Sequence, residues 1–244
     1  MTKDKLVSLA EALGIIPCEN PEQGVYGESL HRDAGELVEG ISRKLGISIV
    51  PPAIDGGLLK IQVGAGLFNE RDLNAVFTAF TLAQHRPSSL CEIGAGSGRV
   101  AYWSHRLGIQ RYTLIDLPQI NVVQGFYLLK ALPDAPIRLH GEPPAEGTTI
   151  LPSEALETVG KIDLVLNQDS FPEIERGIVV KYLEWIKGNA LRFLSINHES
   201  RPPHNMGRQL SVPEIVSEVG GLKLRSRVPY WLRKGYVMEL YEVE

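Results

Sequence analysis

The fold is decided by one stretch, Leu90-Cys91-Glu92-Ile93-Gly94-Ala95-Gly96-Ser97-Gly98-Arg99. Its first four residues predict a buried strand, and glycines at alternate positions let the backbone turn tightly and approach a ligand without a Cβ in the way. The apolar residues Val100, Trp103 and Leu107 then recur at helical spacing. The stretch therefore predicts a strand, a glycine turn and a helix whose first N–H groups are available to a ligand.

Short apolar runs alternate with helix-period segments throughout the chain after Pro87. This alternation is typical of a mostly parallel sheet covered by helices on both faces. The last two runs are joined only by residues 229–235, too short a link for a crossover helix, so we expect them to pair antiparallel. Seven strands are predicted, at Ser89–Ile93, Tyr112–Asp116, Ile137–His140, Ile162–Asn167, Leu191–Ile196, Leu222–Val228 and Tyr236–Val243.

Helical spacing dominates before Pro87. One apolar stripe ends at Gly14, a second ends at Gly46, and a third follows Asn69, which is typical of a helix N-cap with Asp72 three residues later. Connections rich in Pro and Gly separate these segments. We therefore expect two parts, a helical N-terminal cap region over residues 1–86 and an α/β domain over residues 87–244.

Composition excludes several classes of function. The 244 residues carry 25 Lys and Arg against 29 Asp and Glu, a net charge of −4, which disfavours nucleic acid or an anionic membrane as the main partner. The two cysteines form no C-x-x-C pair, the apolar runs are short, and the first residues lack the apolar core of a signal peptide. We expect a cytoplasmic protein, and the sequence leaves a homo-oligomer open.

The glycine turn departs from the dinucleotide fingerprint G-x-G-x-x-G in two ways. The third glycine of that pattern would stand at Arg99, and the strand before the turn carries an acid, Glu92. A carboxylate at this place would repel a diphosphate, whereas a cationic ligand would be attracted to it. The turn therefore favours a positively charged ligand over a nicotinamide dinucleotide.

With these features, Glu92-Ile93-Gly94-Ala95-Gly96-Ser97-Gly98 resembles the first motif of the class I S-adenosylmethionine-dependent methyltransferases. The resemblance implies a Rossmann-like domain in which the turn passes beneath the methionine part of the cofactor. It also implies an acid at the tip of the second strand that holds the ribose hydroxyls, and Asp116 fits this place. On this basis the residues expected to bind S-adenosyl-L-methionine are Glu92, Gly94, Ala95, Gly96, Gly98, Asp116, Leu117 and Asn167.

A wider resemblance rests on three short blocks, 116–118, 167–173 and 195–201. Together they are similar to a family of sugar O-methyltransferases. The resemblance implies transfer of a methyl group to a hydroxyl of a sugar or a glycosylated small molecule, with a sugar-containing acceptor as the partner.

Polar residues follow the fourth and fifth predicted strands, and the carboxyl ends of parallel strands are where ligands collect. His198 is our first choice for the base that takes the hydroxyl proton, because imidazole titrates near neutral pH, and Asp169 is the second. The alternative for His198 is a histidine that hydrogen-bonds a loop carbonyl. The alternative for Asp169 is a residue of the turn after the strand or an acid that caps the following helix. Substrate contacts are expected from Glu173, Asn197 and Arg201. No spacing demands a metal, and none is predicted.

Four other functions compete with this one. Methylation of nitrogen in nucleic acid is disfavoured, because the residues after the fourth strand read Asn167-Gln168-Asp169-Ser170 and the chain is acidic. A nicotinamide-dependent oxidoreductase is disfavoured by Arg99. Methylation of another acceptor class, or a methyltransferase-like binding protein without turnover, remains the alternative.

Overall fold

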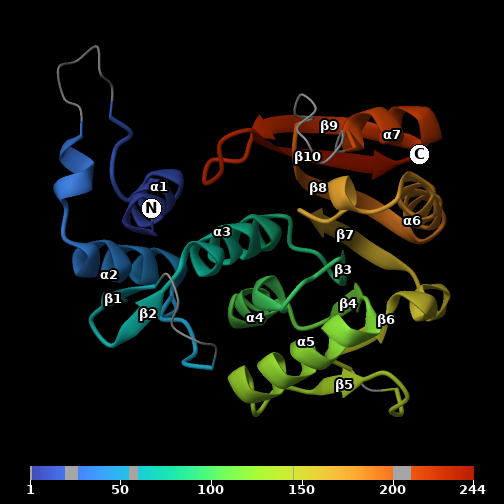
Figure 1. The fold of residues 1–244 in the computed structure, drawn as a ribbon, viewed down its shortest axis with the longest axis horizontal. Helices are drawn as coiled ribbons and strands as arrows, with labels where there is room; N and C mark the ends of the chain where they lie inside the picture. The colour runs from blue at the N-terminus through green and yellow to red at the C-terminus, as the bar shows by residue number, and fades with distance from the viewer. Residues whose placement is uncertain (1, 20–26, 55–59, 145, 200–209) are drawn as a thin grey trace.

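The structure is a computed structural model that describes residues 2–19, 27–54, 60–144, 146–199 and 210–244. Its centre is an eight-stranded sheet with the order β5-β6-β4-β3-β7-β8-β10-β9 (Figure 1). β10 pairs antiparallel with both β8 and β9, and the other neighbours in the sheet are parallel. The strands are β3 (Leu90–Ile93), β4 (Tyr112–Asp116), β5 (Ile137–Leu139), β6 (Thr148–Pro152), β7 (Ile162–Gln168), β8 (Ala190–His198), β9 (Leu222–Pro229) and β10 (Tyr236–Val243).

The seven predicted strands are all present, and the antiparallel last strand is confirmed. The predicted number of strands is wrong by one, because β6 lies between β4 and β5. β6 directly follows the Gly- and Pro-rich residues 141–147, and its short run Thr-Thr-Ile-Leu-Pro resembles a continuation of that loop in the sequence. Its five residues pair in register with β4 and bury Ile150 and Leu151.

The N-terminal region forms the helices that the sequence predicts and one hairpin that it does not. The helices are α1 (Thr2–Ala12), α2 (Ala34–Leu45) and α3 (Glu70–Gln84), with a short 3-10 turn, η2 (Glu28–His31). The hairpin pairs β1 (Ile61–Val63) with β2 (Gly66–Phe68). Asn69 caps α3 as expected, since its side chain accepts from the Asp72 N–H at 2.9 Å in a full capping box.

Helices cover both faces of the sheet. On one face α3, α4 (Arg99–Arg106) and part of α5 (Pro118–Ala131) share a hydrophobic core with α1 and α2. On the other face η3 (Ser153–Thr158), α6 (Arg176–Asn189) and α7 (Val212–Val219) enclose a second core. A last short turn, η4 (Phe171–Glu173), follows β7. None of the helices in the described part of the chain is long and apolar enough to cross a membrane.

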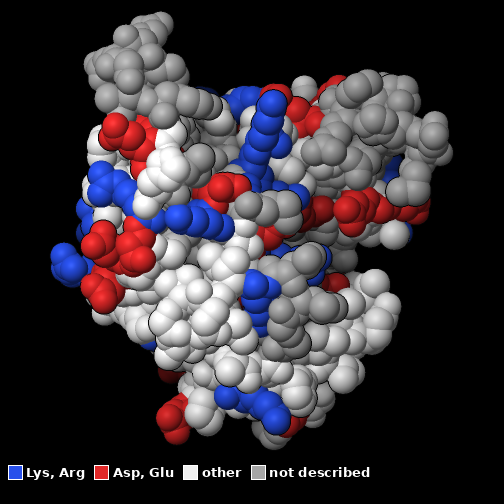
Figure 2. Space-filling model, turned by 60° about the vertical axis from the view of Figure 1, so that its left-hand side comes forward, with Lys and Arg blue, Asp and Glu red and all other residues white. Residues whose placement is uncertain are grey.

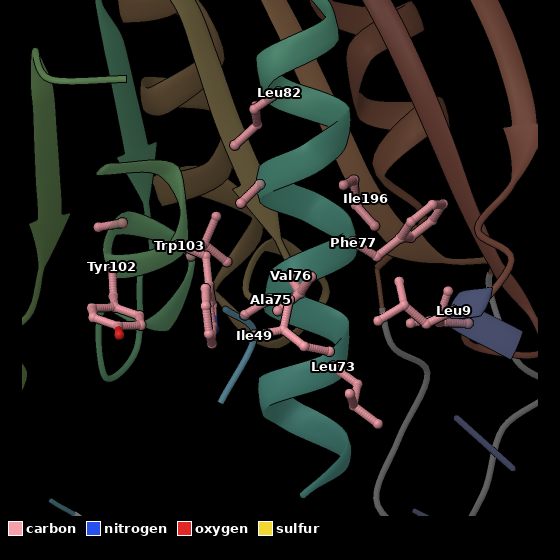
Figure 3. Packing of buried hydrophobic residues seen from close by; sticks show 14 of the residues in the cluster. Leu9, Ile49, Leu73, Ala75, Val76, Phe77, Leu82, Tyr102, Trp103 and Ile196 are labelled. Carbon is pink, nitrogen blue, oxygen red and sulfur yellow. The ribbon is translucent and has the colours of Figure 1, made fainter. Parts of the chain in front are cut away.

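α3 is the element that joins the N-terminal region to the sheet. Figure 3 shows it between Trp103 and Tyr102 of α4 on one side and Leu9 of α1 and Ile196 of β8 on the other. Its own residues Leu73, Val76, Ala79 and Leu82 are at most 1% exposed. Burial of each leucine side chain stabilises the fold by about 2 kcal/mol. This packing holds α3 firmly against the sheet.

Candidate functional site

A cavity of about 540 Å³ opens at the carboxyl ends of β3 and β7, where open parallel sheets collect ligands. Four segments form its wall: the first turns of α3, the β3–α4 turn, the residues after β7, and the end of the β9–β10 hairpin. The described residues on the wall are Glu70, Arg71, Asn74, Ala75, Glu92, Gly94, Ala95, Gly96, Ser97, Arg99, Val100, Gln168, Asp169, Ser170, Glu173, Arg233 and Tyr236.

The glycine turn forms the floor of the cavity, and two of its glycines are required for different reasons. Gly94 has a φ of 76°, and a Cβ there would collide with the Ser170 side chain. Gly96 has a φ of 54°, and a Cβ there would meet no atom within 4 Å, so the space above it is open. Gly94 is thus needed for packing and Gly96 for its conformation and for access to the cavity.

Glu92 lies in the wall of the cavity but is only 2% exposed. Its carboxylate accepts a hydrogen bond from the Tyr112 hydroxyl at 2.7 Å. Burial raises the pKa of Glu92 to about 8, with a smaller contribution from the nearby Asp116 charge, because removing the charged form from water is costly. A cation in the cavity would favour the ionised form.

Asp116 at the end of β4 organises the turn from the neighbouring strand. Its carboxylate accepts from the Gly96 N–H at 2.9 Å and from the Leu117 N–H at 2.8 Å. Burial raises the pKa of Asp116, although these hydrogen bonds oppose the rise. The buried Gln124, which the sequence analysis missed, donates to both Gly96 O and Asp116 Oδ2. Leu117 itself is about half exposed.

Alternation along the strands separates the predicted site residues onto two faces of the sheet. Glu92 and Gln168 belong to the face under α3 and α4, and Gln168 accepts from Thr78 of α3. Asn167 is fully buried on the opposite face, where it donates to Ile93 O at 2.9 Å and accepts from Asn197 at 3.0 Å. Among described residues, the cavity wall includes neither Asn167 nor Asn197. They join β3, β7 and β8 behind the wall.

Asp169 follows β7 on the cavity wall in an uncommon conformation. Its φ is 70°, a region that costs a non-glycine residue free energy, although Asp tolerates it better than most. Its N–H donates to Ile196 O at 3.1 Å, and its carboxylate forms an ion pair with Arg233. The backbone of Asp169 is therefore held by β8 and its side chain by the β9–β10 hairpin.

Arg233 is in turn fixed by Tyr236. Its guanidinium lies 3.8 Å from the centre of the Tyr236 ring, and it donates to the Tyr236 hydroxyl at 2.7 Å. The hairpin itself is anchored by Tyr230, whose buried hydroxyl contacts Thr78 at 2.9 Å and donates to Asn74 O at 3.0 Å. These contacts therefore fix the segment between β9 and β10 that carries Arg233, which is not a free loop.

The remaining predicted residues lie at different places. His198 is buried, its Nδ1 lies 2.9 Å from Glu199 O and its ring meets the edge of Tyr236. It pairs with Tyr236 in the β8–β10 ladder and is absent from the described wall residues. Glu173 is exposed on the wall. Arg201 lies outside the described residues.

Sequence reasoning missed the contributions of α3 and of the hairpin. Glu70, Arg71 and Asn74 occupy the first turns of a helix assigned to a capping role, and Arg233 with Tyr236 lies at a strand connection. The N-cap Asn69 marks where α3 begins, but the sequence does not show that this first turn lies on the cavity wall. Within the described ranges, no group of three His, Cys, Asp or Glu side chains could hold a metal ion.

Comparison with known proteins gives a match to the fold. No protein-family model matches the chain, and no curated protein matches it. Among solved structures, the mitomycin 7-O-methyltransferase MmcR has a TM-score of 0.53 at 14% identity, covering 99% of this chain and 94% of that chain. The magnesium protoporphyrin IX methyltransferase ChlM from Synechocystis PCC 6803, solved with bound SAM, has 0.52 at 13%, covering 78% and 86%. The chain has the class I methyltransferase fold.

A third structure, the glycopeptide N-methyltransferase MtfA complexed with (S)-adenosyl-L-homocysteine, has a TM-score of 0.52 at 14% identity and covers 70% of this chain and 90% of that chain. These class I methyltransferases include both O- and N-methyltransferases by name. The fold is therefore shared by proteins with different acceptor atoms, and the acceptor has to be argued from the cavity.

Proposed function

We propose that this chain is an S-adenosylmethionine-dependent O-methyltransferase that acts on a hydroxyl of a sugar or a glycosylated small molecule. The observation that carries the proposal is the buried Glu92 carboxylate beside an open glycine turn, at the sheet edge where the class I fold gathers ligands. This combination suits a small molecule that is positively charged at one end.

The residues present fit that cofactor. Above Gly96 the space is open, and the buried Glu92 carboxyl group lies in the same wall, where a bound cation would favour its ionised form. Asp116 already accepts from two backbone N–H groups and from Gln124, and its remaining acceptor capacity is available to a ribose hydroxyl. When bound, S-adenosylmethionine would supply an electrophilic methyl group on a positively charged sulfur.

Of the two proposed bases, the geometry favours Asp169. Its carboxylate lies on the cavity wall with a side chain that is 42% exposed, so it can take a proton from an acceptor hydroxyl and release it to solvent. Its strained backbone conformation, held by β8, is typical of a functional residue. His198 contacts Tyr236 instead and would support the wall.

The composition of the wall supports a polyhydroxylated acceptor. Outside the glycine turn most of its described side chains are carboxylates, amides and arginines. The others are Ala75, Val100, Ser170 and one tyrosine, Tyr236, whose ring is covered by Arg233. The described part of this wall therefore offers hydrogen bonds to several hydroxyls and presents no uncovered aromatic ring to a flat acceptor. Figure 2 shows basic and acidic side chains side by side on the visible face, a poor surface for nucleic acid.

Two experiments test the proposal. Calorimetric titration with S-adenosylhomocysteine and, separately, with NADH should show binding of the first alone. Transfer from methyl-tritiated S-adenosylmethionine is then measured on a panel of monosaccharides, glycosides and nucleotide sugars, with phenols and amines as comparators. No binding of S-adenosylhomocysteine at about 1 mM would refute the proposal, since it implies an affinity weaker than about −4 kcal/mol. Labelling of amines alone would refute the hydroxyl acceptor.

A binding protein without turnover is the alternative, and it is tested with single substitutions. Asp169→Asn should abolish most transfer while S-adenosylhomocysteine still binds, whereas His198→Gln should have the smaller effect. If Asp169→Asn transfers at the wild-type rate, Asp169 is not the base. Binding without transfer to any member of the panel favours the alternative.

A further inference from the structure

One ion pair connects the N-terminal region to the glycine turn. Asp72 of α3 accepts from Arg99 Nε at 3.0 Å, and the two side chains are only 4% and 15% exposed, respectively. Arg99 is the first residue of α4, directly after the turn, and it lies on the cavity wall. The pair therefore joins a helix before residue 86 to the loop proposed to bind the cofactor.

Asp72 has both of its carboxylate oxygens occupied. Oδ2 accepts from the Asn69 N–H at 3.3 Å in the capping box that starts α3, and Oδ1 accepts from Arg99. The start of α3 and the direction of Arg99 are consequently fixed by the same side chain. Buried carboxylates are seldom found without such pairing, because an unpaired buried charge is costly.

Arg99 passes this constraint to the turn itself. Its Nη1 donates to Ser97 Oγ, and its guanidinium lies 5.8 Å from the centre of the Tyr127 ring on α5. A cation in the first turn of a helix is unfavourable with respect to the helix dipole, so the partners of Arg99 must offset that cost. Ser97 stands between Gly96 and Gly98, where the backbone conformation of the turn is set.

We propose that Asp72 is a positioning residue for cofactor binding, which acts through Arg99 to hold the Ser97 segment of the glycine turn in its binding conformation. This inference rests on the proposed function. It makes α3 part of the cofactor site as well as a wall for the acceptor. It also assigns Arg99 a role that a glycine at this position could not fill.

The test compares two probes by calorimetry on the full chain. S-adenosylhomocysteine carries the amino-acid end that would lie over the turn, whereas 5′-methylthioadenosine lacks it and keeps the ribose that Asp116 would hold. Asp72→Asn should weaken binding of S-adenosylhomocysteine by about tenfold, the equivalent of one charge-assisted hydrogen bond. Binding of 5′-methylthioadenosine should change by less than about twofold. Arg99→Gln should match Asp72→Asn, and Arg99→Lys should fall between it and wild type.

The matched control is Asn69→Ala, which removes the side-chain cap of α3 and leaves the Asp72–Arg99 pair in place. It should lower the melting temperature and leave both affinities unchanged. The double variant Asp72→Asn/Arg99→Gln should bind no more weakly than Arg99→Gln alone, because both changes break one interaction. Unchanged affinity for S-adenosylhomocysteine in Asp72→Asn and Arg99→Gln, or an equal loss for both probes, would overturn the inference alone. Wild-type protein that binds neither probe would overturn the proposed function and this inference with it.

Discussion

Replacing Glu92 with glutamine should stabilise the chain at alkaline pH and weaken its proposed site. The carboxyl group is almost fully buried, and its oxygen accepts from the Tyr112 hydroxyl, a contact that an amide oxygen can also make. Glutamine has nearly the same shape and carries no charge. The substitution therefore isolates the cost of an ionised group at this position.

The size of the effect follows from the pKa of Glu92. Burial raises this pKa from 4.5 to about 8. Below pH 4.5 the folded and unfolded chains both hold the proton; between pH 4.5 and 8 only the folded chain keeps it, so stability falls as the pH rises. Above pH 8 the ionised Glu92 lowers the free energy of unfolding by its full amount, at most about 5 kcal/mol. Glu92→Gln lacks this penalty.

The assay is urea unfolding followed by far-UV circular dichroism at pH 5, 7 and 9. The unfolding free energy of Glu92→Gln relative to wild type should increase steadily across this series, by several kcal/mol. Glu173→Gln, a carboxyl-to-amide change at an exposed position on the same wall, is the matched control. If the Glu92→Gln and wild-type curves stay parallel from pH 5 to 9, the carboxyl group is not held protonated by burial. Calorimetry at pH 9 should show weaker binding of S-adenosylhomocysteine to the variant.

Three further predictions concern other parts of the molecule. Burial alone would raise the pKa of Asp163, but a backbone N–H and the Arg192 guanidinium outweigh it and lower this pKa, so Asp163→Asn should cost about 1–2 kcal/mol in urea unfolding at pH 7 and less at pH 3. Gly94→Ala should lower the melting temperature strongly, whereas Gly96→Ala, with open space around it, should cost about 1–2 kcal/mol and mainly reduce calorimetric binding of S-adenosylhomocysteine. Arg233→Gln should slow methyl transfer about tenfold or more without changing that affinity, as radiolabel assays and calorimetry would show.

The sequence was sufficient for the sheet and the glycine turn because both depend on local patterns. Alternating strands and helices predict a parallel sheet, and glycines at alternate positions predict a tight turn, in which Gly94, Gly96 and Gly98 adopt positive φ values. β6 was missed because its run Thr-Thr-Ile-Leu-Pro directly follows the Gly- and Pro-rich residues 141–147 and itself ends in proline, so it resembles a continuation of the loop. The one additional strand leaves the fold class unchanged.

Side-chain direction at the strand ends was harder to predict. Asn167 and Gln168 are neighbours in sequence, yet only Gln168 faces the cavity, since successive residues of a strand point to opposite faces. Successive strand residues are expected to alternate between the two faces of the sheet. Which residues face the cavity depends on the face to which the glycine turn opens. Knowing that Glu92 and Leu166 pair across β3 and β7 settles this question, and this register is not visible in the sequence.

The part of the cavity proposed to bind the acceptor depends on contacts between segments far apart in the chain. Thr78 of α3 contacts both Gln168, next to Asp169, and Tyr230, on the hairpin that carries Arg233. One hydroxyl thus links the N-terminal region to two of the cavity's other walls. A change in how α3 packs would therefore move the proposed base and its arginine partner together. The acceptor specificity of this chain should consequently depend on residues buried under α3 as much as on those that touch the acceptor.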